Sequence, residues 1–519
     1  MESDISFIAQ LEWEILRTKY EIPIEESPNS EFLPIGTEKV EIYRDEAYSI
    51  NMKVSGRLDN GNEMSDWVNR WNPREELEGF TPPLEFEILT SIWNYQLVGC
   101  YYNGSQGSPI RRNTQTSNQA IWGFEAIFSV SRICRKLKHL PNNENAVWLT
   151  EWYLNAPRKN FYSQLTTRDF SVEYRRNRRA ADSNNFIFPI KRGGSVDHIF
   201  VELDNLSFLI QGVPESLIPD WSKCLGIEYR EEWGGIPESS KRQAIAEIVS
   251  FIAGRQLLNV GYTKFQESGY VIEEVAIKPS YSFDQNIINL CELPDSSPVK
   301  LVKFNADNGR IEYKTEKVLQ NLVPKYLSLR DKLQLDKILQ AYWLFQEIPI
   351  GRNLPVLAAG IETLAEKFLA YKNIKKSGEY ISKDRFKSLL KEEITSIEKK
   401  LKNEPQGQRM IEKIKSAYSF QLGSAGTIKA FFEEIQLKIG DLEKEAMQVR
   451  NDMTHSTIDF SNNDDRFRMY KLTETYRTLF NRIMLKILEF EDMYIDYSTF
   501  NLPERHISEP AGSSPDEMM

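Results

Sequence analysis

The sequence predicts an α+β multidomain protein, in which a β-rich N-terminal region is followed by an all-α helical bundle. Nine of the ten tryptophans and 18 of the 26 glycines precede residue 320, where short apolar runs alternate with turn residues. After about residue 325, apolar residues recur at helical spacing through several long segments. A chain of 519 residues is long enough for about three domains of ~150 residues, or for two large ones.

Residues 1–320 are predicted to form the β-rich region, and the sequence leaves open whether it is one domain or two subdomains. Turn sequences such as Asp59-Asn-Gly61 separate the strand-like runs, since asparagine and glycine accept positive φ. The clearest runs are Lys39–Tyr43, Phe86–Thr90, Asp197–Val201, Ser207–Ile210 and Tyr270–Val275. Apolar spacing predicts one helix over Ser240–Ala253. We expect His198 and the tryptophans to pack in the core.

Residues 325–497 are predicted to form the bundle. Its helical segments are Leu327–Phe345, Leu354–Tyr371, Lys383–Leu401, Gln408–Phe420, Ala425–Ile439, Asp441–Met453 and Asp465–Tyr494. Gly440 followed by Asp441 indicates the end of one helix and the N-cap of the next, and Ser382 is predicted to cap the helix that begins at residue 383. Prolines, serines and a glycine near the C-terminus predict that residues 498–519 form a disordered tail.

Several classes of protein are disfavoured by what the sequence lacks. It has no run of ~18 apolar residues for a membrane span, and its start lacks the features of a secretory signal. The four cysteines lie far apart, and no two histidines have a metal-ligand spacing. Phosphate-binding loops, dinucleotide fingerprints and serine-hydrolase elbows do not occur. We therefore expect a cytoplasmic protein that uses no metal or other cofactor.

Charge is distributed unevenly along the chain. The net charge of −10 belongs to residues 1–320, because residues 321–519 carry 30 basic and 30 acidic residues. Within the second part, residues 351–415 hold 15 basic and 9 acidic residues, which either attract a polyanion or form a solvated helix face. A second basic cluster, in the N-terminal region, binds RNA phosphates or an acidic trigger protein, or is an exposed loop. Its members are Arg175, Arg176, Arg178 and Arg179.

One short motif combines the groups that RNA cleavage requires. Arg450 is followed directly by Asn451 and, five residues on, by His455. Histidine titrates near neutral pH and can move protons, whereas arginine binds phosphate oxygens bidentately. Five residues of α-helix turn by about 500°, which places positions 450 and 455 about 140° apart. They meet at one phosphate only if the helix end is distorted or if two chains face each other. The alternative is a solvated arginine and a histidine favoured by the helix dipole.

Arg450-Asn451-x-x-x-His455 resembles the Arg-φ-x-x-x-His motif of the HEPN ribonucleases, in which φ is commonly Asn, Asp or His. The segment Leu357–Leu369, with Glu362 among small and aliphatic residues, is similar to the early bundle helix of that family. The resemblance covers about residues 325–497. The layout of the whole chain is similar to that of the ApeA-like anti-phage proteins.

The resemblance implies a metal-independent endoribonuclease that acts as a homodimer, with RNA as its substrate, in abortive infection. His455 would be the general acid/base, Arg450 would stabilise phosphate charge, and Asn451 would orient its neighbours. Asp452 adds a negative charge that would pair with Arg450 or face solvent. We expect the N-terminal region to sense a phage-derived or other trigger and to restrain a toxic nuclease. A second reading is a non-catalytic dimeric scaffold that binds nucleic acid or protein.

Overall fold

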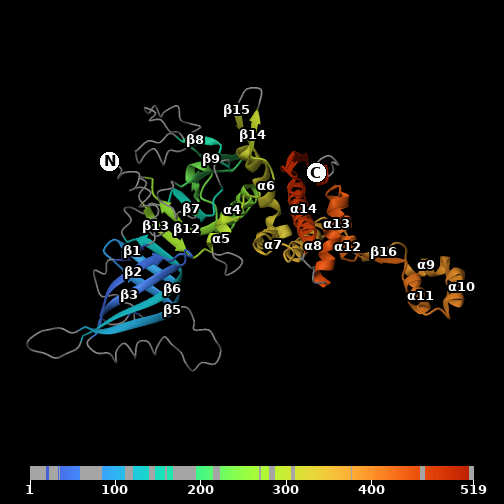
Figure 1. The fold of residues 1–519 in the computed structure, drawn as a ribbon, viewed down its shortest axis with the longest axis horizontal. Coiled ribbons are helices and arrows are strands. Elements are labelled where there is room, and N and C mark those ends of the chain that lie inside the picture. The colour runs from blue at the N-terminus through green and yellow to red at the C-terminus, as the bar shows by residue number, and fades with distance from the viewer. Residues whose placement is uncertain are drawn as a thin grey trace, which may run out of the picture. The chain divides into compact units, whose positions relative to one another are not determined.

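The computed structural model describes residues 19–22, 33, 36–58, 84–110, 121–138, 146–157, 161–166, 195–213, 222–267, 271–279, 287–305, 310–375, 377–455 and 462–512. The chain divides into two compact units, Met1–Pro324 and Lys325–Met519. The first is rich in strands and the second is helical (Figure 1). The predicted fold class, a β-rich region followed by a helical bundle, is confirmed.

A large antiparallel sheet dominates the first unit. Its described strands are β1 (Lys19–Ile22), β2 (Thr37–Arg44), β3 (Ile50–Leu58), β4 (Leu84–Leu89), β5 (Trp93–Ile110), β6 (Ile121–Leu137), β7 (Trp148–Leu154), β8 (Gln164–Thr166), β9 (Ser195–Leu203), β10 (Leu206–Gly212), β11 (Cys224–Arg230), β12 (Leu258–Phe265) and β13 (Val271–Ile277). They follow the order β1-β2-β3-β6-β13-β12-β7-β11-β10-β9-β8, and β5 pairs with both β4 and β6. All five predicted strand runs overlap strands of this sheet, although Thr90 lies beyond the end of β4 and Tyr270 lies outside the described residues.

Strand β6 is shared by two lobes of the sheet. One edge pairs with β5, whereas the other pairs with β3 up to Val130 and with β13 from Arg132 onward. The change occurs at Ser131, whose hydroxyl donates to the carbonyl of Gly99 at 3.1 Å. Gly99 has φ +67°, and a Cβ there would lie 2.7 Å from the Ser131 Cβ. The sheet therefore branches at a point that accepts only glycine on the neighbouring strand.

Helix α4 (Ser239–Ala253) lies against β7, where Arg242 Nε donates to Glu151 Oε1 at 2.7 Å. Its bounds confirm the predicted helix. His198, on β9, has no exposed surface, and Trp152 and Trp233 are buried, as predicted. Trp93, Trp122 and Trp148 are only partly buried, so the prediction that the tryptophans pack in the core holds for part of the described set.

The remaining elements of the first unit are short. They are the 3-10 helix η6 (Glu231–Trp233), α5 (Ile287–Glu292), and a hairpin of β14 (Val302–Asn305) and β15 (Arg310–Tyr313). Helix α6 (Thr315–Leu333) then crosses the division between the two units.

The bundle of the second unit is built around α8 (Leu354–Tyr371). This helix packs against α7 (Leu335–Glu347), α12 (Ser424–Glu434), α13 (Asp441–His455) and α14 (Asn463–Ile487). In the core, the rings of Tyr342 and Phe480 stack with their centroids 4.7 Å apart. Sequence periodicity predicted one helix over Leu327–Phe345, but Gln334 adopts a left-handed conformation (φ +55°) and divides it into α6 and α7.

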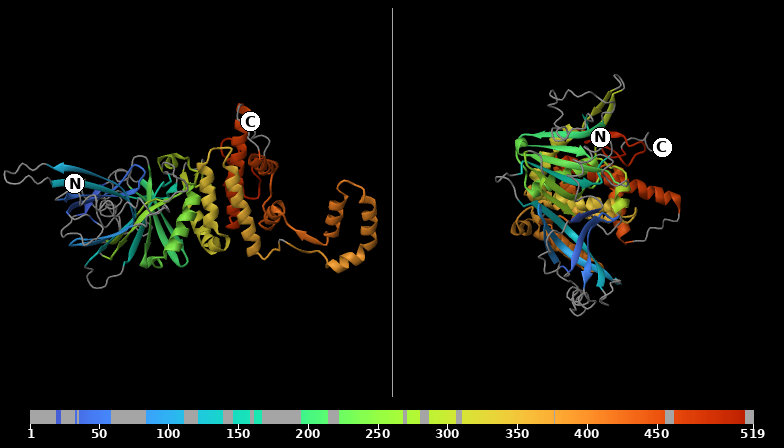
Figure 2. Two further views of the ribbon diagram at one scale, coloured as in Figure 1. Left: turned by 90° about the horizontal axis from the view of Figure 1, so that it is seen from below. Right: turned by 90° about the vertical axis from the view of Figure 1, so that its left-hand side faces the viewer.

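An excursion between α8 and α12 forms what we call the arm, residues 372–421. Its stem is a two-stranded ribbon of β16 (Ser377–Glu379) and β17 (Ser419–Gln421). Beyond the stem lie α9 (Lys383–Leu389), α10 (Lys391–Leu401) and α11 (Gly407–Lys415). Both views show these helices carried away from α8 and α12 (Figures 1 and 2). The two helices predicted here are therefore wrong in detail: one breaks at Leu390, and the other ends at Lys415 before β17.

The predicted disordered tail requires a correction. Residues 498–512 are ordered: β19 (Glu504–His506) pairs with β18 (Met493–Ile495), and Ile507 and Ala511 are buried. The prediction counted prolines and glycines, but here the chain is held by hydrogen bonds to Asp496. Residues 513–519 lie outside the described part of the chain.

Two further observations bear on the protein's class. In the part of the chain that the structure describes, no helix combines the length and apolar character that a membrane crossing demands. All four cysteines are free and buried.

Candidate functional site

Helix α13 carries the motif, and its first turn is tied down by a capping interaction. The backbone N–H of Gly440 donates to Glu443 Oε2 at 2.8 Å, so that a glutamate three residues into the helix reaches back to its start. Asp441, predicted as the cap, is instead the first helical residue. Lys444 Nζ donates to its carboxylate at 2.8 Å, which lowers the pKa of Asp441.

A buried ion pair fixes α13 to α14. Glu443 Oε1 accepts from Arg482 Nη1, and both side chains are completely buried. Arg482 also donates to the carbonyls of Lys438 and Ile507 at 3.1 and 3.3 Å. Burial raises the pKa of the Glu443 carboxyl, while Arg482 and the Gly440 N–H oppose that shift by stabilising the carboxylate. Because both charges are desolvated, the loss of either partner would leave an expensive unpaired charge.

The buried stripe of α13 determines where the motif positions fall on the helix. Among the side chains that the structure describes on this helix, those of Glu443 and Ala446 are buried and that of Gln448 is exposed. A step of about 100° per residue places position 450 on the side of Glu443 and Ala446, and position 455 on the side of Gln448.

The structure puts all three motif residues on the last turns of α13, which is helical through His455. Of the two arrangements that would bring Arg450 and His455 together, a distorted helix end is therefore not observed. An unbroken helix leaves the two positions about 140° apart. Residues 456–461, which follow, lie outside the described part of the chain.

The start of α14 exposes large aromatic side chains. Phe467 and Tyr470 are 71% and 50% exposed, and their spacing of three places them on one side of the helix. Arg468, which lies between them in the sequence, binds Glu445 of α13 with contacts of 3.0 and 2.6 Å. From Leu472 onward α14 is almost entirely buried. The aromatic pair thus projects from a helix that is otherwise the centre of the bundle.

Glu362, singled out in the sequence, connects two other helices of the bundle. It lies on α8 and accepts a hydrogen bond at 2.9 Å from the hydroxyl of Ser424, the first residue of α12. Its role in the structure is to join α8 to α12.

A clasp at the C-terminal end of the described chain, residues 493–512, covers the start of α13. The carboxylate of Asp496 is fully buried and accepts hydrogen bonds from five donors. These are Ser498 N, Ser498 Oγ, Thr499 Oγ1, Arg505 Nε and Gly512 N. Burial alone would raise the pKa of Asp496, but these donors outweigh burial and lower it. Pro510 of the clasp lies so near Gly440 that a Cβ there would come within 2.7 Å of it.

Sequence reasoning missed the Glu443–Arg482 pair and the Asp496 clasp. A usable signal existed for Glu443, since its distance from Gly440 is that of a capping box. Nothing in the sequence marks Arg482 or Asp496 as buried partners.

The basic cluster Arg175, Arg176, Arg178 and Arg179 lies outside the described residues. Among the described residues, no group of three or more histidine, cysteine or acidic side chains is placed to hold a metal ion.

Comparison with known proteins identifies the helical unit. Residues 357–494 match the family model described as Apea-like HEPN. No curated protein and no solved structure matches the chain. The match begins within α8, ends within β18 and includes the motif on α13. Residues 357–494 of this chain therefore resemble the Apea-like HEPN domain, whose family is associated with nuclease-like functions in anti-phage defence.

Proposed function

We propose that this protein is a metal-independent endoribonuclease of anti-phage defence, and that Arg450, Asn451 and His455 are its catalytic residues. One observation carries the proposal: the motif occupies the end of α13, inside the segment that matches the Apea-like HEPN family. Each residue type supplies one requirement of RNA cleavage by the neighbouring 2′-hydroxyl. The proposal also accounts for a preference for RNA, because DNA lacks that hydroxyl.

The proposed reaction is an internal transesterification. The 2′-oxygen attacks phosphorus, the bond to the 5′-oxygen breaks, and the products carry a 2′,3′-cyclic phosphate and a 5′-hydroxyl. His455 accepts the proton of the 2′-hydroxyl or gives one to the departing 5′-oxygen. Arg450 neutralises the charge that develops on the phosphorane oxygens, and Asn451 orients the RNA or its neighbours.

We further propose that two copies of the chain form a composite site. Positions 450 and 455 point about 140° apart on an unbroken helix, so one chain alone does not direct both at one phosphate. A facing copy supplies a second arginine and a second histidine. The exposed pair Phe467 and Tyr470, near the start of the helix that follows the motif, supports this arrangement, because large exposed rings suit an interface between chains.

Control by the N-terminal unit and a role in abortive infection complete the proposal. A nuclease without a sequence reader would damage the cell that makes it, and the strand-rich unit is large enough to hold a sensor. Constant, full-rate cleavage by the whole chain without any trigger would argue against this control.

The decisive experiment is cleavage of RNA in EDTA by the full-length protein. We expect wild type to leave 2′,3′-cyclic phosphate ends, and His455→Ala and Arg450→Ala each to lower the rate by ~10²–10⁴. Gln448→Ala, one heptad before His455 on the exposed side of α13, is the matched control and should retain activity. If His455→Ala and Arg450→Ala cleave RNA as fast as Gln448→Ala and wild type do, the assignment of the site is wrong.

A mixing experiment tests the composite site separately. A heterodimer of His455→Ala and Arg450→Ala chains keeps one intact histidine and one intact arginine. Activity above that of either homodimer is expected if the residues of two chains serve one cleft. Replacing Phe467 and Tyr470 together by aspartate should yield a monomer without activity, which sedimentation and cleavage assays would detect. An active monomer would exclude the composite site.

A further inference from the structure

The arm has almost no core of its own. Its helices α9, α10 and α11 comprise 27 residues, of which Phe386, Gly407 and Ile411 are buried. The ring of Phe386 contacts that of Tyr418 at 5.8 Å between centroids. Gly407 is required by the close turn between α10 and α11, since a Cβ there would lie 1.9 Å from the Leu401 carbonyl oxygen. A segment this small buries too little apolar surface for substantial independent stability.

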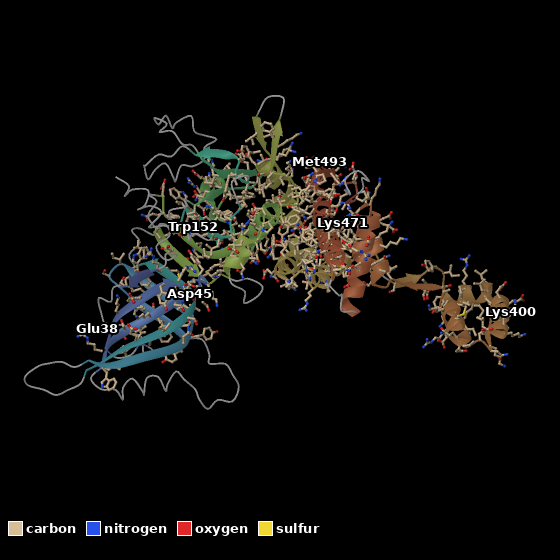
Figure 3. The ribbon with its side chains drawn as sticks, in the orientation of Figure 1. Glu38, Asp45, Trp152, Lys400, Lys471 and Met493 are labelled. Carbon is tan, nitrogen blue, oxygen red and sulfur yellow. The ribbon has the colours of Figure 1, made fainter. Side chains whose placement is uncertain are left out.

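The surface of the arm is strongly and locally basic. Residues 372–421 carry 13 basic and 7 acidic residues, and 11 of the 13 are lysines. The rest of the helical unit, in contrast, holds 17 basic and 23 acidic residues. Figure 3 shows Lys400 on the arm, among side chains that stand outward from the small helices. The positive charge of this unit is therefore concentrated where the fold projects from the bundle.

Few of these cations are used within the chain. In the described part of the arm, an ion pair is formed by Lys415, with Glu398 at 2.5 Å. The cations on the outer faces of the helices are exposed and include Arg385, Lys399, Lys400, Arg409 and Lys413. On α11, Arg409 and Lys413 lie one turn apart, on the side opposite the buried Ile411.

Helix stability does not explain this pattern. Cations in the last turn of a helix interact favourably with its dipole, which accounts for Lys387, Lys399 and Lys413. Arg385 and Arg409, however, lie in first turns, where the same dipole disfavours positive charge. The first turn of α11 contains no acidic residue that would offset Arg409. Positive charge is thus retained where it opposes helix formation.

We propose that the arm is an RNA-binding element that grips the phosphate backbone of the substrate. The proposal rests on the proposed ribonuclease function and identifies where that site's substrate is held. Tyr380, Leu389, Leu390 and Met410 are also exposed on the arm. RNA nevertheless fits the charge of this surface better than a second copy of the chain does, because 11 of the 13 cations are lysines and protein interfaces are depleted in lysine. Phosphates, in contrast, are bound by exposed lysine and arginine side chains, and the released counterions drive association.

The test is RNA binding by a full-length protein in which four arm cations are neutralised. Arg385, Lys400, Arg409 and Lys413 are each replaced by glutamine. The matched control replaces four exposed lysines of other elements by glutamine: Lys241, Lys303, Lys317 and Lys337. Both variants move the net charge from −10 to −14, so they differ only in where the charge is lost. The substituted side chains are exposed, and circular dichroism and thermal unfolding should confirm that both proteins fold.

The probe is a fluorescein-labelled single-stranded RNA with 2′-O-methyl groups at every position, which cannot undergo 2′-hydroxyl attack. Fluorescence anisotropy across a range of salt concentrations gives affinity and salt dependence together. We expect the arm variant to bind more weakly and to reduce the slope of log K against log salt by about 3, at ~0.7 per lost phosphate contact. The slope of the control variant should differ from the wild-type slope by no more than ~0.7, the value for one phosphate contact.

Several results would overturn the proposal. One is an arm variant that binds RNA with the wild-type slope. Another is an arm variant that loses self-association but still binds RNA, which would make the arm a contact between copies. Because the probe cannot be cleaved, the outcome does not depend on catalysis. If wild type cleaves RNA and the arm variant binds RNA as well as wild type does, the arm proposal is wrong and the nuclease proposal is unaffected. If RNA binds through the arm but wild type never cleaves it, the arm proposal is supported and the nuclease proposal is wrong.

Discussion

Helix α14 and the helices of the arm belong to one unit but are stabilised in different ways. Of the 25 residues of α14, 15 are buried, whereas the 27 residues of α9, α10 and α11 include three. Burial of apolar surface therefore stabilises α14, whereas the arm buries little apolar surface and gains little stability from it. Helices therefore have two separate uses in this chain. In the bundle they form the packed core that supports the motif, and in the arm they hold charged side chains at the surface.

The largest expected effect tests that contrast directly. Phe480→Ala, in the core beside Tyr342, should lower the free energy of unfolding of the bundle by about 3–5 kcal/mol. Phe386→Ala should leave the bundle unchanged and loosen only the arm. Hydrogen exchange of the full chain, read separately for α14 and for α9–α11, measures both. If Phe386→Ala lowers the protection of α14 as much as Phe480→Ala does, the arm and the bundle form one cooperative unit and the contrast is wrong.

The next effect concerns the anchor of α13. Glu443→Gln should cost about 2–3 kcal/mol, because it leaves the buried guanidinium of Arg482 without its carboxylate. Lys444→Gln is the control, since its ion pair with Asp441 is exposed. Thermal unfolding and exchange of the α13 amides report the change. An equally small effect of both substitutions would show that the clasp, rather than the ion pair, holds the helix.

The clasp itself is expected to contribute less. Asp496→Asn removes the charge that five donors bind and should cost about 1–2 kcal/mol. The pKa of Asp496 is lowered in the folded protein, so its stabilisation is present above the ordinary aspartate pKa and is lost as pH falls toward the folded value. Wild type should therefore lose more stability on acidification than Asp496→Asn. Asp492→Asn, at an exposed position, serves as the control. If the stability of Asp496→Asn depends on pH as that of wild type does, Asp496 is not the source of the pH dependence.

The smallest predicted effect lies at the end of α7. Both carboxylate oxygens of Glu347 are buried without a hydrogen-bond partner in the described structure, and burial raises its pKa to about 7. The folded state then binds more protons than the unfolded state between about pH 4.5 and 7, so stability should fall as pH rises through that window. Glu347→Gln should remove this dependence and stabilise the bundle by up to ~1 kcal/mol above pH 7, after allowance for partial exposure.

Thermal unfolding at pH 5 and pH 8 measures the effect of Glu347. Glu392→Gln, at an exposed position in the arm, provides a matched loss of charge. If Glu347→Gln and wild type show the same difference in melting temperature between the two pH values, the carboxyl is solvated and the prediction fails.

Much of the fold was predictable because its local patterns agree with its tertiary structure. The run Leu354–Tyr371 became α8 with the predicted bounds, since its apolar stripe is the one that the bundle buries. The helix over Lys383–Leu401 failed at Leu390 for the opposite reason. With so little core in the arm, no packing requires the two halves to continue as one helix. Periodicity predicts bounds best where burial enforces them.

The candidate site shows the same division. By itself, the sequence determined the residue types of the motif, their spacing and their place late in a helical bundle. The side on which α13 packs was decided by Glu443 and its partner Arg482, 39 residues further along the chain. The ordered C-terminal segment was decided by the buried carboxylate of Asp496. The physical reason is common to both: a buried charge is stable only with partners that the folded chain brings to it, and local sequence carries no record of which partners those are.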